Sequence, residues 1–90
     1  MSIDPRTYLK MLGYQVRDRL TGLRGVVTSV SFDVNGCVQG FVTPPVDEKG
    51  EPRPGRWVDW KTLSIMDNRP VVEQPDFVDV PGGRDLPPPR

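Results

Sequence analysis

The sequence LTGLRGVVTSVSF, at residues 20–32, contains two glycines and then a run of β-branched and hydroxyl residues that ends on an aromatic. A Walker-type phosphate loop needs Gly-Lys-Ser/Thr after a spacer, and a dinucleotide-binding loop needs three glycines at the start of a helix. Neither pattern is present, and the residues after Gly25 have no helical period. We therefore predict a tight turn between two strands, in which Gly22, Gly25 or both adopt positive φ.

The composition limits the classes of function. The chain has 90 residues, with 12 Lys and Arg, 12 Asp and Glu, and a formal net charge of zero. A chain this short predicts one small domain with little room for a deep catalytic cleft, and a neutral molecule has no long-range attraction for nucleic acid or anionic membranes. The single cysteine excludes an internal disulfide, and neither a signal peptide nor a membrane span is recognisable. We expect a soluble protein of a reducing compartment.

Residues 1–13 predict a short helix. Asp4 is a suitable N-cap, Pro5 fits the first helical position and Gly13 fits a C-cap. The helix is therefore expected over residues 4–12. Its apolar residues, which would pack on the following chain, are Tyr8, Leu9, Met11 and Leu12.

Residues 14–72 predict a small β-domain, because the pattern changes to alternation and then to β-branched runs. The sequence DVNG at 33–36 is typical of a hairpin turn, and residues 44–55 are a longer loop rich in proline, glycine and charge. The expected strands are residues 14–19, 26–32, 37–43, 56–60 and 63–66, with residues 71–72 as an extension of the last. This order predicts a mainly β fold, a small five-stranded antiparallel barrel.

Residues 73–90 have the sequence EQPDFVDVPGGRDLPPPR and differ from the β-domain in their high proline content. Each proline lacks a backbone donor and fixes φ, so the segment cannot form a central strand. We predict an extended proline-rich arm. Its apolar residues Phe77, Val78 and Val80 are the expected anchors in a groove of a partner protein.

Several short motifs carry a resemblance to a known family. A Leu-Gly start is followed by Val-x-Asp, a Thr-Gly-x-x-Gly turn, a Gly-Cys pair and a Trp-x-Asp. These positions, which span about residues 12–63, are Leu12, Gly13, Val16, Asp18, Thr21, Gly22, Gly25, Gly36, Cys37, Trp57 and Asp59. The pattern resembles a family of small, mostly uncharacterised proteins of tailed phages and prophages, although Leu23 replaces a usual aromatic and Trp60 a usual acidic residue. The turn also resembles the diverging turn of SH3-like and KOW-type barrels, which implies an SH3-like barrel here.

The chain offers few residues for catalysis or metal binding. It has no histidine, so Cys37 would need another partner to form a thiolate, and we predict that this cysteine is a small buried hydrophobe at the start of a strand. Zinc needs several Cys or His ligands. The loop acids Asp47, Glu48 and Glu51 are expected to be solvated and to hold a hard cation only loosely. No enzymatic activity, cofactor or metal site is predicted.

The two tryptophans are better candidates for a binding site. Strand alternation places Trp57 and Trp60 on opposite faces, so one should lie in the core and the other near the surface. An exposed tryptophan beside another aromatic residue stacks a base or cages a cation. The alternative is that Trp57 covers the barrel end or the helix, because a small domain needs its large apolar residues for burial.

A basic edge is predicted around the first turn. Residues 1–25 have an excess of three positive charges. This excess favours weak, salt-sensitive contacts with an acidic partner rather than base-specific recognition. The residues of the edge are Arg17, Arg19, Arg24 and Lys61.

These features favour a non-enzymatic phage module that docks on a larger protein assembly, such as the virion, in the host cytoplasm or within the particle. The expected partner-binding residues are Phe77, Val78, Val80, Arg17, Arg19, Arg24 and Trp57. A second interpretation is an accessory factor that inhibits a host defence protein or sequesters a signalling nucleotide, with the arginines on phosphate and Trp57 on a base. A third is a weak nucleic-acid-binding barrel, which the zero net charge disfavours. Self-association stays open, and no membrane partner is expected.

Overall fold

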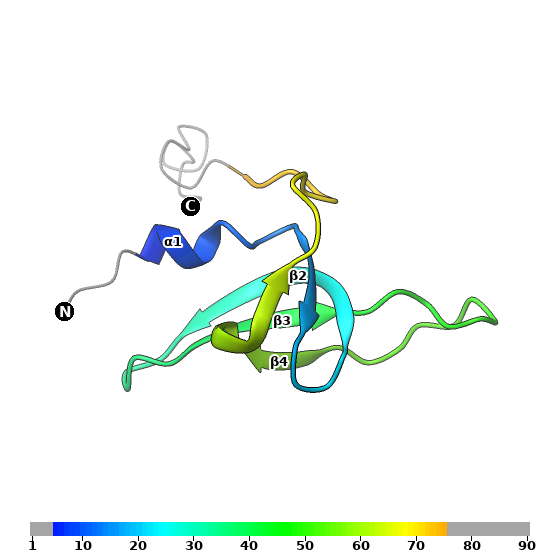
Figure 1. The fold of residues 1–90 in the computed structure, drawn as a ribbon, viewed down its shortest axis with the longest axis horizontal. Helices are drawn as coiled ribbons and strands as arrows, with labels where there is room; N and C mark the ends of the chain where they lie inside the picture. The colour runs from blue at the N-terminus through cyan, green and yellow to red at the C-terminus, as the bar shows by residue number, and fades with distance from the viewer. Residues whose placement is uncertain (1–4, 76–90) are drawn as a thin grey trace, which may run out of the picture.

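The computed structural model describes residues 5–75, and residues 1–4 and 76–90 lie outside the described part. In chain order, the elements are α1 (Pro5–Leu9), β1 (Gln15–Asp18), β2 (Arg24–Phe32), β3 (Val38–Thr43), β4 (Arg56–Asp59), the 3-10 helix η1 (Trp60–Thr62) and β5 (Leu63–Ile65). Figure 1 shows α1 lying over the sheet, with the β2–β3 hairpin and the β3–β4 loop projecting at opposite ends. No helix in the described residues is long and apolar enough to cross a membrane.

The five strands form one antiparallel sheet in the order β4-β3-β2-β1-β5. The mainly β, five-stranded antiparallel prediction is therefore confirmed. The sheet is open, however, because β4 and β5 are its two edges and do not pair with each other, so the predicted closed barrel is not observed. Closure requires every strand to pair on both sides, and β4 and β5 supply only four and three residues for a further ladder.

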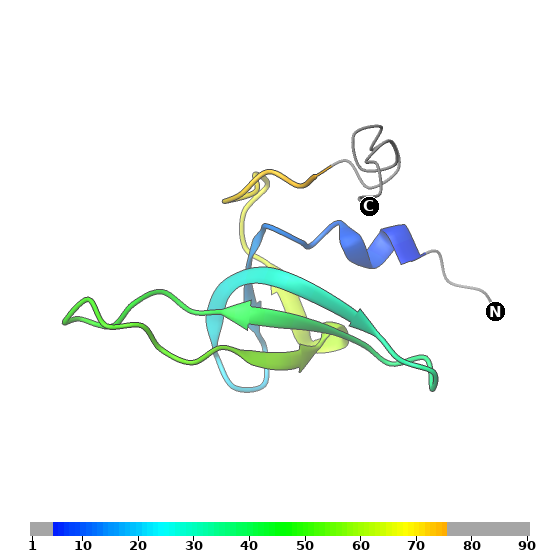
Figure 2. The same cartoon turned by 180° about the vertical axis from the view of Figure 1, so that it is seen from behind.

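The apolar core lies on one face of the sheet, which we call the inner face. Val16, Val27 and Val42 are fully buried there, because alternate residues of neighbouring strands point to the same side. Two residues of the N-terminal segment, Tyr8 and Met11, are buried against this face, as the sequence predicted. Seen from behind in Figure 2, α1 again lies along the sheet.

The helix is shorter than predicted, because α1 ends at Leu9 rather than at residue 12. After it the backbone bonds tighten to a three-residue spacing: Met11 N donates to Tyr8 O and Leu12 N to Leu9 O. Gly13 has a φ of +88°, but it lies four residues beyond Leu9 and its N–H donates to Val27 O, so it is not the C-cap that the sequence predicted. The predicted N-cap, Asp4, lies outside the described residues.

The turn of the opening stretch confirms the prediction at one glycine. Gly22 has a φ of +82°, while Gly25 has no positive φ and lies in β2. Gly25 is needed for a different reason, since a Cβ there would lie 2.4 Å from the backbone oxygen of Thr43 on the neighbouring strand. The two glycines thus serve a turn and a close strand contact, respectively.

The β2–β3 hairpin corrects the prediction for the cysteine. The predicted 33–36 turn is present, with Gly36 N donating to Asp33 O at 3.0 Å and with a positive φ at Gly36. Cys37 N donates to the Asp33 carboxylate at 3.0 Å, so this residue completes the turn and β3 begins at Val38. The Cys37 side chain is exposed, and the prediction of a buried thiol was wrong.

The chain after β5 returns over the N-terminal segment. Val71 N and Val72 N both donate to Gly13 O, so these valines form a bend there rather than the predicted extension of the last strand. The Gln74 amide then donates to the backbone carbonyls of Leu9, Lys10 and Leu12. Gln74, within the segment predicted as an arm, therefore contacts the C-terminal end of α1.

Candidate protein-interaction surface

The face of the sheet opposite the core, the outer face, carries an exposed aromatic pair. Trp57 on β4 pairs across strands with Phe41 on β3, and their rings meet edge to face with centroids 5.2 Å apart. Trp57 lies outside the core and is 45% exposed, whereas Phe41 beneath it is half-buried. Gly55 permits this arrangement, because a Cβ at this position would lie 2.6 Å from the Phe41 ring.

The two tryptophans lie in different surroundings, as alternation predicted. Trp60 is half-buried against the core, and its ring meets that of Tyr8 with centroids 4.7 Å apart. It is therefore Trp60, and not Trp57, that covers the helix. The sequence reasoning did not identify Phe41 as a site residue. The inward positions Val38 and Val42 on the same strand would have predicted its outward direction.

The aromatic pair lies beside a free strand edge. β4 pairs with β3 on one side and has no strand on its other side among the described residues. A free edge presents backbone N–H and C=O groups to which an extended segment of another protein adds as a further strand. Trp57 and this edge together form a surface on which backbone pairing and aromatic contact occur side by side.

The predicted basic edge also lies on the outer face. Arg17 on β1 is the direct cross-strand partner of Arg24 on β2, and both are exposed. Arg19 N donates to Thr62 O, and its guanidinium donates to the Lys61 carbonyl, so it lies against η1. The structure thus groups Arg17, Arg19 and Arg24, as expected.

The structure does not bring Trp57 together with these arginines. Phe41 pairs with Trp57 on one side and with Ser29 of β2 on the other. Ser29 lies five positions along β2 from Arg24. At about 3.3 Å per residue this offset corresponds to roughly 16 Å. The outer face therefore has two separate surfaces, one aromatic and one basic. The other predicted contact residues, Phe77, Val78 and Val80, lie outside the described residues.

Asp18, which belongs to the motif of the family resemblance, has a structural role. Its carboxylate is buried and accepts hydrogen bonds from Thr21 Oγ1 at 2.7 Å and Leu20 N at 3.1 Å. The hydrogen bond from Thr21 lowers the pKa of Asp18 below its ordinary value of 3.8, against the opposite effect of burial. The carboxylate therefore holds the turn that contains Gly22, and its lone pairs are already engaged.

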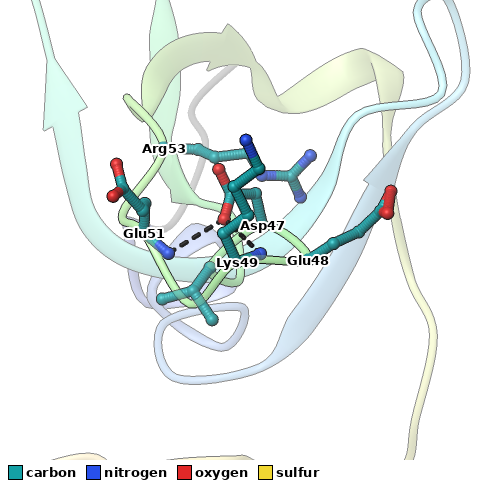
Figure 3. Close-up of a pocket in the computed structure, with 6 residues that line it drawn as sticks. Asp47, Glu48, Lys49, Glu51 and Arg53 are labelled. Carbon is teal, nitrogen blue, oxygen red and sulfur yellow. Dashed lines mark hydrogen bonds between the residues drawn. The ribbon is translucent and has the colours of Figure 1, made fainter.

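The acidic loop is a turn of the same kind as the first hairpin. Figure 3 shows the Asp47 carboxylate directed at two backbone N–H groups of its own loop, those of Lys49 at 2.8 Å and Glu51 at 2.9 Å. Glu48 is exposed, and Arg53 Nε donates to the Pro45 carbonyl. Within residues 5–75, no group of three or more His, Cys, Asp or Glu is arranged for metal binding. The Asp47 side chain is thus used for turn geometry.

Two apolar grooves, each of about 320 Å³, adjoin the N-terminal segment before β1. The first lies between α1 and β5 and is lined by Thr7, Tyr8, Lys10, Met11, Val16, Trp60, Leu63 and Ile65. The second lies between β2 and the returning chain and is lined by Leu12, Gly13, Val26, Val27, Thr28, Val72, Glu73, Gln74 and Pro75. Both are formed by the packing of the terminal segments on the inner face.

No family model, no curated protein and no solved structure matches the chain. The resemblance to phage proteins therefore stays a prediction.

Proposed function

We propose that the protein is a non-enzymatic interaction module of a tailed phage or prophage, which docks on a larger protein assembly such as the virion. The observation that carries this proposal is the 45% exposure of Trp57 on the outer face. A small domain gains stability by burying its tryptophans, as it does with Trp60. An exposed tryptophan on a rigid strand is instead typical of the anchor residue of a protein interface.

The neighbourhood of Trp57 supports a protein partner. Its ring rests on Phe41, so its position is fixed before binding and little side-chain entropy is lost. The free edge of β4 adds backbone groups that recognise an extended chain. The docking surface proposed here is therefore the outer face around Trp57, Phe41 and the β4 edge.

The proposed architecture is SH3-like. The strand order β4-β3-β2-β1-β5, a long β2 shared by both halves of the sheet, and a 3-10 turn between β4 and β5 support it. In such a fold the loops and the strand edges carry the contacts, and the core only positions them.

The proposal is tested by co-sedimentation of the purified protein with particles of the encoding phage. Trp57→Ala should abolish retention on the particles while leaving the thermal melting temperature nearly unchanged, because Trp57 lies outside the core. The matched control is Val34→Ser, which removes a 98% exposed apolar side chain at the β2–β3 hairpin tip and should leave retention unchanged. Full retention of Trp57→Ala would refute the proposed surface.

A further inference from the structure

The second surface of the outer face consists of Arg17, Arg19 and Arg24, and we call it the basic end. Asp18 N donates to Leu23 O and Val27 N to Tyr14 O, so the Arg17–Arg24 pair between them occupies a non-hydrogen-bonded position of the β1–β2 ladder. Directly opposite residues at such positions have Cα atoms about 4.5 Å apart and their side chains closest together. The two arginines therefore project from adjacent strands to the same face, with their Cβ atoms close together.

The charges of this pair are not neutralised within residues 5–75. In the described part of the chain, neither Arg17 nor Arg24 has an ion-pair partner. The nearest acid in sequence, Asp18, has its buried carboxylate engaged by Thr21 and by its own turn. The next residue in the row, Ser64 on β5, adds a hydroxyl but no charge. Like charges placed directly opposite each other destabilise a sheet, so the pair is expected to serve an anionic ligand.

The chain itself contains a segment with the complementary pattern. Residues 73–81 have the sequence EQPDFVDVP, with carboxylates at every third position, at Glu73, Asp76 and Asp79. The prolines of this segment favour polyproline II geometry, in which three residues make one turn and advance about 9 Å. The carboxylates would then line one edge of the bound segment.

This spacing matches the basic end. Arg24 lies on β2, Arg17 on β1, and the Arg19 guanidinium reaches the Lys61 carbonyl in η1, directly before β5. Neighbouring strands are about 4.8 Å apart, so the cations span about 10 Å across three strands. An exposed Leu20 beside Arg19 offers an apolar contact for Phe77 or Val80.

The arm of the same molecule is badly placed to occupy this surface. Gln74 is fixed at the end of α1, which covers the inner face, whereas the arginines lie on the outer face. Four residues from Pro75 to Asp79 extend at most about 14 Å. In Figure 1 the segment that ends at Pro75 (orange) lies above the sheet and the β1–β2 turn (blue) lies below it.

We infer that residues 73–81 of one copy bind the basic end of a second copy, with one of the carboxylates Asp76 and Asp79 on the adjacent Arg17–Arg24 pair and the other on Arg19. The contact is head to tail, so it joins copies into a ring or a filament rather than a closed two-fold dimer. The inference rests on the proposed function in one respect: it names the partner of the arm and of the basic end within a docking module.

The test uses the full-length protein alone, studied by sedimentation velocity over a range of protein concentrations. The wild type should associate with rising concentration, and the association should weaken when NaCl is raised from about 50 mM to about 500 mM, because surface ion pairs are screened. Arg17→Glu/Arg24→Glu and Asp76→Lys/Asp79→Lys should each reduce the association constant by about tenfold or more. Lys49→Glu, in the β3–β4 loop, is the matched control and should associate like the wild type.

Mixing the two double variants gives the decisive result. The first variant retains an intact arm and the second an intact basic end, and the reversed charges of the second arm and the first basic end are also complementary, so association should return in the mixture although it is weak in either variant alone. A wild type that stays monomeric, or an association that survives Arg17→Glu/Arg24→Glu with its salt dependence intact, would overturn the inference. Since particle binding is measured separately through Trp57→Ala, either proposal can fail while the other stands.

Discussion

The inner and outer faces of the sheet are formed by the same strands but carry side chains of different kinds. On the inner face Val16, Val27 and Val42 have no exposed surface, and α1 lies over them. On the outer face the corresponding positions hold an exposed tryptophan and two adjacent arginines. Packing accounts for the inner residues, whereas on the outer face the Arg17–Arg24 pair is repulsive and Trp57 stays 45% exposed in spite of its contact with Phe41. The inner face therefore determines the fold, and the outer face is the one that we propose for binding.

The largest expected effect comes from breaking the inner face at Gly25. Gly25→Val places a Cβ 2.4 Å from the Thr43 oxygen, so the β2–β3 contact must open, and we expect a loss of about 3 kcal/mol or more in the free energy of unfolding. Gly22→Val has open space around its Cβ but a φ of +82°, so strain alone should cost about 1–2 kcal/mol. Urea denaturation measures both. Equal losses at the two sites would contradict this distinction.

A smaller loss of stability is expected from a substitution at Asp18, where the turn meets the sheet. The folded-state pKa of this carboxyl is lowered, mainly by Thr21, so its contribution to stability is complete above the unfolded pKa of about 3.8. That contribution is lost as the pH falls through the folded pKa. Asp18→Asn should therefore reduce the free energy of unfolding by about 1–2 kcal/mol at neutral pH.

The difference in the free energy of unfolding between Asp18→Asn and the wild type should decrease as the solution is acidified. Urea titrations at neutral pH and at successively lower pH below 3.8 measure the difference. A gap that stays constant over this range would show that the charge of Asp18 has no part in holding the turn.

The sequence predicted the local features of the fold best. Turn residues act through their own backbone, so the 33–36 hairpin and the positive φ of Gly22 could be inferred without the rest of the chain. The antiparallel pairing of five short strands could also be inferred, because turns join several of them. Closure of the sheet did not, because it depends on how many residues β4 and β5 supply for a ladder.

The candidate site was predicted only in part. Arg17, Arg19 and Arg24 were expected together, and they are together, since they flank a single turn. Phe41 was missed because its role comes from the β3–β4 register, which joins positions on two sides of a long loop. The exposure of Cys37 was also missed, because one residue of shift at the hairpin moves a side chain out of the strand.

A modest effect is expected at Gln74, which links the two ends of the folded part. Gln74→Ala removes the amide that donates to the carbonyls at the end of α1, and we expect a loss of about 0.5–1 kcal/mol, because these hydrogen bonds are exposed to water. Removal of residues 76–90 keeps Gln74 and should leave the thermal melting temperature nearly unchanged. The same truncation should abolish association between copies and weaken any docking that uses the arm.

Thermal melting of the two variants separates these roles. A truncation at residue 75 that melts far below the full-length protein would mean that the removed segment stabilises its own domain, and the arm would then not be free for a partner.

The smallest expected effect has the opposite sign and lies on the outer face. Arg17→Thr removes one of two like charges held on adjacent strands and introduces a residue that favours strands, so the free energy of unfolding should rise by about 0.5 kcal/mol. The matched substitution Gln39→Thr, at an exposed outer position of β3 without the charge pair, should change stability less. Urea denaturation at low salt measures both, and added NaCl should reduce the gain, because screening already weakens the repulsion in the wild type. The same Arg17→Thr variant should associate less in sedimentation velocity than the wild type. A residue whose removal stabilises the fold and weakens association is maintained for binding, whereas a loss of stability in Arg17→Thr would mean that the arginine supports the sheet.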